Sequence, residues 1–136
     1  MNTTENANAI FPKGERTNPD YFTGIAWLNT LLAKDETGTY AIGSVTFEPG
    51  GKTNWHTHPA GQILLVTEGK GFYQEKGKPV QVIKKGDVIV IPSKIEHWHG
   101  ASKDSSLNHI AITNNVNGVP VTWLSPVSDE EYKSCH

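Results

Sequence analysis

The segment Gly50–Gly69, GGKTNWHTHPAGQILLVTEG, holds two histidines, His56 and His58, that are separated by one residue. Side chains at positions i and i+2 of a β-strand point to the same face, so both imidazoles can converge on one point. Imidazole binds zinc, copper, iron and nickel, and binds manganese when oxygen ligands complete the site. The spacing alone allows a metal site, and it equally allows a pair of polar histidines on the rim of a sheet.

A second histidine pair makes coincidence a weaker explanation. The segment Gly86–Gly100, GDVIVIPSKIEHWHG, holds His97 and His99, and each pair adjoins a tryptophan, Trp55 or Trp98. By simple counting, a chain of this histidine content gives one H-x-H pair about a quarter of the time. Because Trp98 lies between two histidines, we expect it to face away from them, into packing.

Short apolar runs separated by turn residues extend over most of the chain. They are rich in Val, Ile, Thr and aromatic residues, as in TYAIGSVTFEPGG, QILLVTEGKG, GDVIVIPS and LNHIAIT. This pattern predicts antiparallel strands in an all-β sandwich or barrel, with a jelly roll as the natural class. Only the end of the chain is helix-like, because Ser128–Glu131 has the spacing of a capping box before a short helix from Glu130 to about Ser134.

Composition limits the classes of function. The chain has 136 residues, which predicts one domain, with residues 1–20 as a flexible arm or edge extension and residues 21–136 as the domain. The formal charge is −2 without a basic block, which argues against nucleic acid as a partner. The single cysteine, Cys135, excludes an internal disulfide framework. Neither a signal peptide nor a membrane span is recognisable, so we expect a cytoplasmic protein.

The two histidine segments together resemble the two-motif signature of the cupin superfamily. The first motif of that family runs from a glycine through His-x-His and a glutamate to a second glycine, and here Gln62 stands in the glutamate position between Gly50 and Gly69. The second motif runs from a glycine through a proline to a third histidine, which matches Gly86–His97. One glycine of the second motif is replaced by Lys94, which we expect to alter only a turn. The resemblance implies a conical jelly-roll β-barrel with a metal inside.

The same resemblance implies that His56, His58 and His97 are metal ligands, with Gln62 in the place of the family's carboxylate. A neutral amide oxygen leaves the full charge of a divalent ion, which makes the ion a stronger Lewis acid for an anionic oxygen. It also suits a high-valent iron–oxygen species less well than a carboxylate does. The alternative is that Gln62 is a hydrogen-bonding strand residue that never touches a metal.

A closer resemblance is to the small bacterial cupins that include manganese-dependent hydroxynitrile lyases, which cleave cyanohydrins to an aldehyde and cyanide. It rests on Gln62, on the segments EHWHG and LNHIAI, and on the tail V-x-D-E-x-Y. It implies Mn(II) as cofactor, with Fe(II), Zn(II), Ni(II) and Co(II) as alternatives. It also implies His109 as the general base and His99 as an assisting donor. Each of these histidines has a simpler explanation, because buried histidines often only hydrogen-bond the backbone.

Two other functions remain open from the sequence. One is a metal-dependent dioxygenase acting on a small carbonyl or hydroxy compound, and the other is a ligand-binding cupin without catalysis, since the scaffold does not decide the activity. The expected partner is a small-molecule substrate. A homodimer or homotetramer is also expected, with the apolar segment GIAWLNTLL as a plausible contact.

Overall fold

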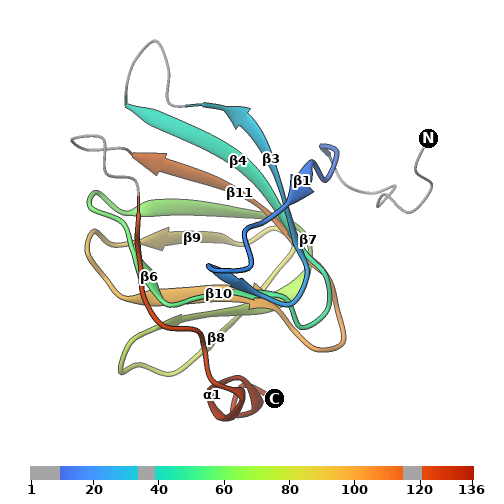
Figure 1. Ribbon diagram of the computed structural model, residues 1–136, viewed down its shortest axis with the longest axis vertical. Coiled ribbons are helices and arrows are strands. Elements are labelled where there is room, and N and C mark those ends of the chain that lie inside the picture. The colour runs from blue at the N-terminus through green and yellow to red at the C-terminus, as the bar shows by residue number, and fades with distance from the viewer. Residues whose placement is uncertain (1–9, 34–38, 115–120) are drawn as a thin grey trace.

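The computed structural model describes residues 10–33, 39–114 and 121–136 of the chain. Its strands join one curled sheet in the order β1-β3-β4-β11-β7-β10-β5-β2, with β6, β8, β9 and β12 paired off this path (Figure 1). This architecture confirms the predicted all-β jelly roll. The strands are β1 (Glu15–Arg16), β2 (Phe22–Thr23), β3 (Ala26–Leu32), β4 (Tyr40–Phe47), β5 (Lys52–Thr53), β6 (His56–Thr57), β7 (Gln62–Glu75), β8 (Gln81–Lys84), β9 (Val88–Ile91), β10 (His97–Ala101), β11 (Leu107–Asn114) and β12 (Thr122–Trp123).

Strand β7 connects the two halves of the sheet. Its first part pairs with β11 and β9, and its second part pairs with β10 and β8. Gly69 lies where the partners change, with φ of +83°, and a Cβ added there would stand 1.9 Å from the carbonyl oxygen of Ser106. Only glycine fits this close approach without strain. The last glycine of the first motif is therefore required by the bend of the sheet.

The interior of the barrel is filled by alternate side chains of the strands, as expected for residues that point to one face. Leu64, Val66, Ile89 and Ile91 come from the long central strand and its neighbour β9. Tyr73 joins them from the second part of β7, Phe47 from β4 and Leu107 from β11, and all are buried. This core adjoins the candidate site, because the Phe47 ring lies 6.0 Å from that of His99 and 5.5 Å from that of His109.

A second apolar cluster lies on the outer side of the sheet, under helix α1 (Asp129–Lys133). Trp55 and Trp98 are its largest buried members, so the expectation that Trp98 faces away from the histidines is confirmed. The helix starts at the predicted capping box, in which the Glu131 amide donates to Ser128 Oγ at 3.1 Å and the Ser128 amide donates to Glu131 Oε1 at 2.8 Å. In the described part of the chain, no helix is long and apolar enough to cross a membrane.

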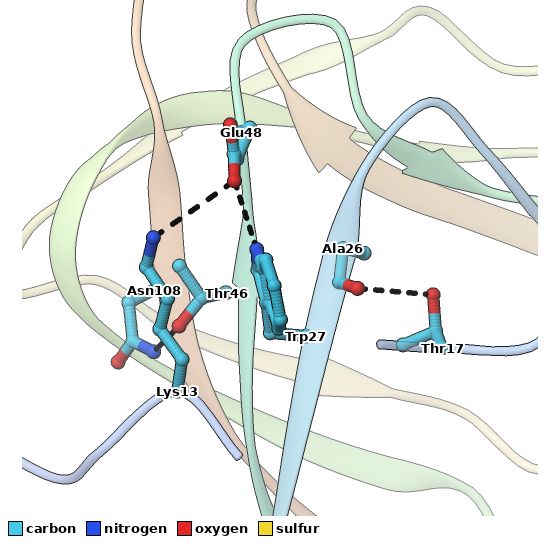
Figure 2. A network of polar contacts seen from close by, with 7 residues as sticks. All are labelled: Lys13, Thr17, Ala26, Trp27, Thr46, Glu48 and Asn108. Atoms are coloured by element: carbon cyan, nitrogen blue, oxygen red, sulfur yellow. Dashed lines mark hydrogen bonds and ion pairs between the residues drawn. The ribbon is translucent and has the colours of Figure 1, made fainter. Parts of the chain in front are cut away.

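The N-terminal segment is held at the edge of the sheet, first by a hydrogen bond from Asn29 Nδ2 to the Pro12 carbonyl and then by strand pairing from Glu15. Strand β1 pairs with β3, and Lys13 forms an ion pair with Glu48 at 3.8 Å, as Figure 2 shows. The same carboxylate accepts a hydrogen bond from Trp27 Nε1 at 2.9 Å. Residues 1–9 of the predicted arm lie outside the described residues. The homodimer or homotetramer stays a prediction.

Candidate metal centre

Two strands bring histidines from distant parts of the sequence together. Strands β6 and β10 pair so that His56 stands opposite His97. The ring centroids of these two residues are 4.2 Å apart, and His99, two residues further along β10, lies 5.3 Å from His56. Ligand atoms of His56, His97 and His99 all lie within 4.8 Å of one another, and all three side chains are buried. This is the spacing that one metal ion can bridge.

Hydrogen bonds to the backbone orient two of these rings. His56 Nδ1 lies 2.8 Å from the carbonyl oxygen of Asn54, and His97 Nδ1 lies 2.8 Å from that of Ile95. A carbonyl only accepts, so Nδ1 carries the proton in both rings and Nε2 keeps its lone pair. His97 Nε2 is buried and has no hydrogen-bond partner within the described residues. This is how metal-binding histidines are normally held, so the residues fit a divalent metal.

The other two predicted ligands lie at the same cavity. The His58 ring is 5.0 Å from that of His56 and 5.5 Å from that of His97. Gln62 Nε2 donates to Thr113 Oγ1 at 2.9 Å, while Gln62 Oε1 is buried and accepts no hydrogen bond from any described residue. An amide oxygen in this position is available to a cation. The assignment of His58 and Gln62 as ligands stays a prediction.

The structure decides which face of β11 borders the cavity. His109 stands opposite Val45 on β4 and Val66 on β7, is fully buried and lines the cavity. Asn108, its neighbour, points to the opposite face, where its amide donates to Thr46 Oγ1 at 2.8 Å (Figure 2). The inward position of His109 is the one the resemblance implied.

His99, a member of the three-histidine cluster, forms a hydrogen-bonded pair with His109. His109 Nε2 and His99 Nδ1 are 3.1 Å apart, and the ring centroids are 4.8 Å apart. The outer nitrogens of the pair, His109 Nδ1 and His99 Nε2, are buried and have no hydrogen-bond partner among the residues described. Both residues line the cavity, and these two nitrogens are the ring atoms of the pair that no described residue occupies.

Burial keeps the cluster neutral. Desolvation lowers the pKa of His97 to about 4 and that of His109 to about 4, because the charged ring loses its hydration. The pKa values of His56 and His99 are lowered well below the ordinary value by burial first and by the neighbouring histidines second. Neutral imidazoles are the form that binds metals and accepts protons near neutral pH.

The cavity beside the histidines has a volume of about 280 Å³ and a mostly apolar wall. Trp123 of β12 packs on His56 at a centroid distance of 4.8 Å, and the Phe22 ring lies 5.7 Å from that of Trp123. The small size and apolar wall suit a small molecule with an aromatic or aliphatic group. The apolar lining residues are Phe22, Leu28, Leu32, Ala33, Ala41, Ile42, Val45, Ala111, Val121 and Trp123.

Two features of the site are absent from the sequence prediction. The structure places His99 in the three-histidine cluster, although it was predicted only as a donor. His97 and His99 are two residues apart on one strand, so their side chains share a face, just as those of His56 and His58 do. This spacing could have indicated His99 as a third member of the cluster. The contact of Thr113 with Gln62 spans 51 residues and has no local signal.

Lys94, which stands in place of a glycine of the second motif, adopts φ of 63°, so the lysine keeps a turn conformation that favours glycine.

The curled all-β sheet and the inward-facing histidines define a cupin-type barrel with a candidate metal centre. The chain belongs to the cupin family, since the family model described as "Cupin domain" matches residues 43–113.

Several individual proteins are similar to this chain. The chain is 42% identical over 114 residues to an (R)-mandelonitrile lyase from Granulicella tundricola, covering 84% of this chain and 87% of the relative. It is 35% identical over 82 residues to the auxin-binding protein ABP19b of Prunus persica, which covers 57% of this chain and only 34% of that protein. The crystal structure of a cupin-like protein from Thermotoga maritima matches with a TM-score of 0.89 and 48% identity, covering 93% of this chain and 96% of that one.

Proposed function

We propose that this protein is a metal-dependent lyase that cleaves cyanohydrins to an aldehyde and cyanide. The observation that carries the proposal is the His99–His109 hydrogen bond, which joins His109 to a member of the three-histidine cluster at an apolar cavity. The similarity to an (R)-mandelonitrile lyase over most of both chains supports the same reaction.

The metal would be held by His56, His58, Gln62 and His97, which leaves His99 to the proton-transfer pair, and we propose Mn(II). When bound, it supplies a Lewis acid that lowers the pKa of a substrate hydroxyl. Gln62 lines the cavity, its amide adds no negative charge, and its buried oxygen has no hydrogen-bond partner in the described chain. This donor set favours stabilisation of an anionic oxygen over activation of dioxygen.

The histidine pair offers one base and one acid in a fixed arrangement. One of the two facing nitrogens must donate and the other must accept, since each neutral ring carries one N–H. If His109 Nε2 donates to His99 Nδ1, then His109 Nδ1 has the free lone pair and His99 Nε2 carries a free proton. The opposite tautomers exchange these roles. In either state the pair presents one acceptor and one donor to the cavity.

This arrangement matches what cyanohydrin cleavage requires. His109 Nδ1 takes the hydroxyl proton, the carbon–cyanide bond breaks as the carbonyl forms, and the leaving cyanide takes the proton from His99 Nε2. As His99 Nε2 gives up its proton, the Nε2 proton of His109 crosses the 3.1 Å hydrogen bond to His99 Nδ1, so both rings end neutral. No net proton is gained or lost, and the pair ends in its other tautomeric state.

A cyanide-release assay combined with metal analysis tests the proposal. Protein reconstituted with Mn(II) is expected to release cyanide from (R)-mandelonitrile and to contain metal in stoichiometric amount. His109→Ala is expected to keep the metal and to lose at least about a hundredfold in rate, which is the usual contribution of a general base. His136→Ala, which removes an exposed histidine at the C-terminus, is the matched control. Metal-loaded protein without cyanide release would refute the lyase.

A second candidate is a ligand-binding cupin without catalysis. The observation that favours it is the partial similarity to an auxin-binding protein. In that case aromatic carboxylates would bind to the metal-loaded protein with no turnover of any cyanohydrin. The dioxygenase alternative would instead show oxygen uptake with Fe(II) and a small carbonyl or hydroxy compound.

A further inference from the structure

A carboxylate stands directly opposite one of the cluster histidines. In the pairing of β10 with β7, Glu75 faces His97 and Tyr73 faces His99. Directly paired residues of antiparallel strands point to the same side of the sheet, with Cβ atoms about 5 Å apart. Glu75 and Tyr73 therefore lie on the inner face together with the histidines, and the Tyr73 and His97 ring centroids are 5.9 Å apart.

Two contacts hold this carboxylate in its charged form. Tyr73 Oη donates to Glu75 Oε2 at 2.7 Å, and Lys78 Nζ lies 3.1 Å from Glu75 Oε1. The Glu75 side chain is only 16% exposed, whereas that of Lys78 is 69% exposed. The hydrogen bond from Tyr73, followed by that from Lys78, lowers the pKa of Glu75. The group thus carries a negative charge at neutral pH, in a place partly shielded from water.

The negative charge of Glu75 affects the pKa of His97. Burial lowers the pKa of His97, and Glu75 partly opposes the effect by favouring the positive ring. Of the four buried histidines with lowered pKa values, His97 is the one whose pKa the Glu75 charge affects. Any positive charge bound to these rings experiences the same attraction.

The predicted ligand set lacks such a charge. Three imidazoles and one amide leave a divalent ion with its full charge inside an apolar barrel, where desolvation is costly. A nearby carboxylate reduces that cost without occupying a coordination position. We propose that Glu75 is a positioning residue that stabilises the bound divalent ion through His97, and that Lys78 weakens this effect by pairing with it. The inference rests on the metal binding contained in the proposed function.

The dissociation constant for Mn(II) tests the inference without reference to activity. Glu75→Gln keeps an oxygen that accepts the Tyr73 hydrogen bond but removes the charge, and we expect metal to bind roughly tenfold more weakly. Glu68→Gln is the matched control, because Glu68 lies on the same strand, is 23% exposed and pairs with Lys85 at 3.7 Å. This control is expected to bind metal as the unmodified protein does.

Removing the lysine should have the opposite effect. Lys78→Gln frees the Glu75 charge from its ion pair, and metal is expected to bind roughly threefold more tightly, within the range of an exposed pair. In the Glu75→Gln background the same lysine substitution should change nothing, because there is no longer a charge to unmask. A merely structural role of Glu75 would not produce effects of opposite sign. Thermal unfolding of the metal-free variants checks that each one is folded.

The outcomes separate the two claims. If the unmodified protein binds metal and Glu75→Gln binds it as tightly as Glu68→Gln does, the inference fails and the proposed function stands. A tighter Glu75→Gln or a weaker Lys78→Gln also overturns it. If the unmodified protein binds no divalent metal, the proposed function and the inference fail together.

Discussion

Acid should destabilise the metal-free protein through its buried histidines. His97 and His109 each have a pKa of about 4 when folded, against about 6.5 in an unfolded chain. The folded protein therefore binds fewer protons than the unfolded chain between these two values, and stability falls as the pH falls from about 6.5 to about 4. Above pH 6.5 both states are neutral at these rings, and the stability is fully present.

The size of the effect follows from the two pKa values. At pH 5, one histidine with these properties costs about 2 kcal/mol of the free energy of unfolding relative to pH 8. His97 and His109 do not appear among each other's causes of displacement, so their costs should nearly add to about 4 kcal/mol. A domain is typically stable by about 5–15 kcal/mol, so this loss brings the protein close to unfolding.

Urea denaturation of the metal-free protein at a series of pH values from 8 to 5 measures this loss. His109→Gln should lower the difference between pH 8 and pH 5 by about 2 kcal/mol, whatever its effect on stability at pH 8. His136→Gln, at an exposed position, is the control and should keep the full difference. A pH dependence that is equal in the two variants would show that burial of His109 is not the cause.

Three further perturbations test the site and its support. Gln62→Glu adds a negative charge at the cavity and should tighten Mn(II) binding by at least about tenfold while slowing cyanide release; faster release would contradict the Lewis-acid argument. Thr113→Val removes the oxygen that accepts the Gln62 amide hydrogen bond, and Mn(II) binding should weaken several-fold. Thr30→Val, at the same cavity, is the control and should leave Mn(II) binding unchanged. Equal effects of the two substitutions would exclude a role of Thr113 in orienting Gln62. Tyr132→Phe removes the 2.6 Å hydrogen bond to the Ala101 carbonyl and should cost about 1 kcal/mol in urea denaturation, so an unchanged midpoint would show that the helix end contributes nothing through this bond.

Local patterns predict a large part of this structure because they report local geometry. The i, i+2 spacing of the histidines places each pair on one strand face, and the capping box of Ser128 marks the start of the only helix among the described residues. The three motif glycines, Gly50, Gly69 and Gly86, adopt positive φ, as turns between strands require. These features need no knowledge of the rest of the chain.

Features that depend on contacts across the barrel have no such local signal. Alternation in LNHIAI is compatible with either face inward, and pairing with β4 and β7 decides that His109 borders the cavity. The packing of Trp123 on His56 joins positions 67 residues apart in the chain, so no local pattern indicates it. The same holds for Glu75, whose partner His97 follows only from the register of β7 and β10.

The alternation that turns His56 and His97 inward turns Trp55 and Trp98 outward, beneath the C-terminal helix. The terminal ring of His136 packs on Phe72 in the same layer, at a centroid distance of 5.0 Å. Residues fused to the C-terminus would therefore lie next to the outer side of the strands that carry the site. For recombinant work, an affinity tag belongs at the other terminus, and a C-terminal fusion should be checked for metal content before its activity is compared.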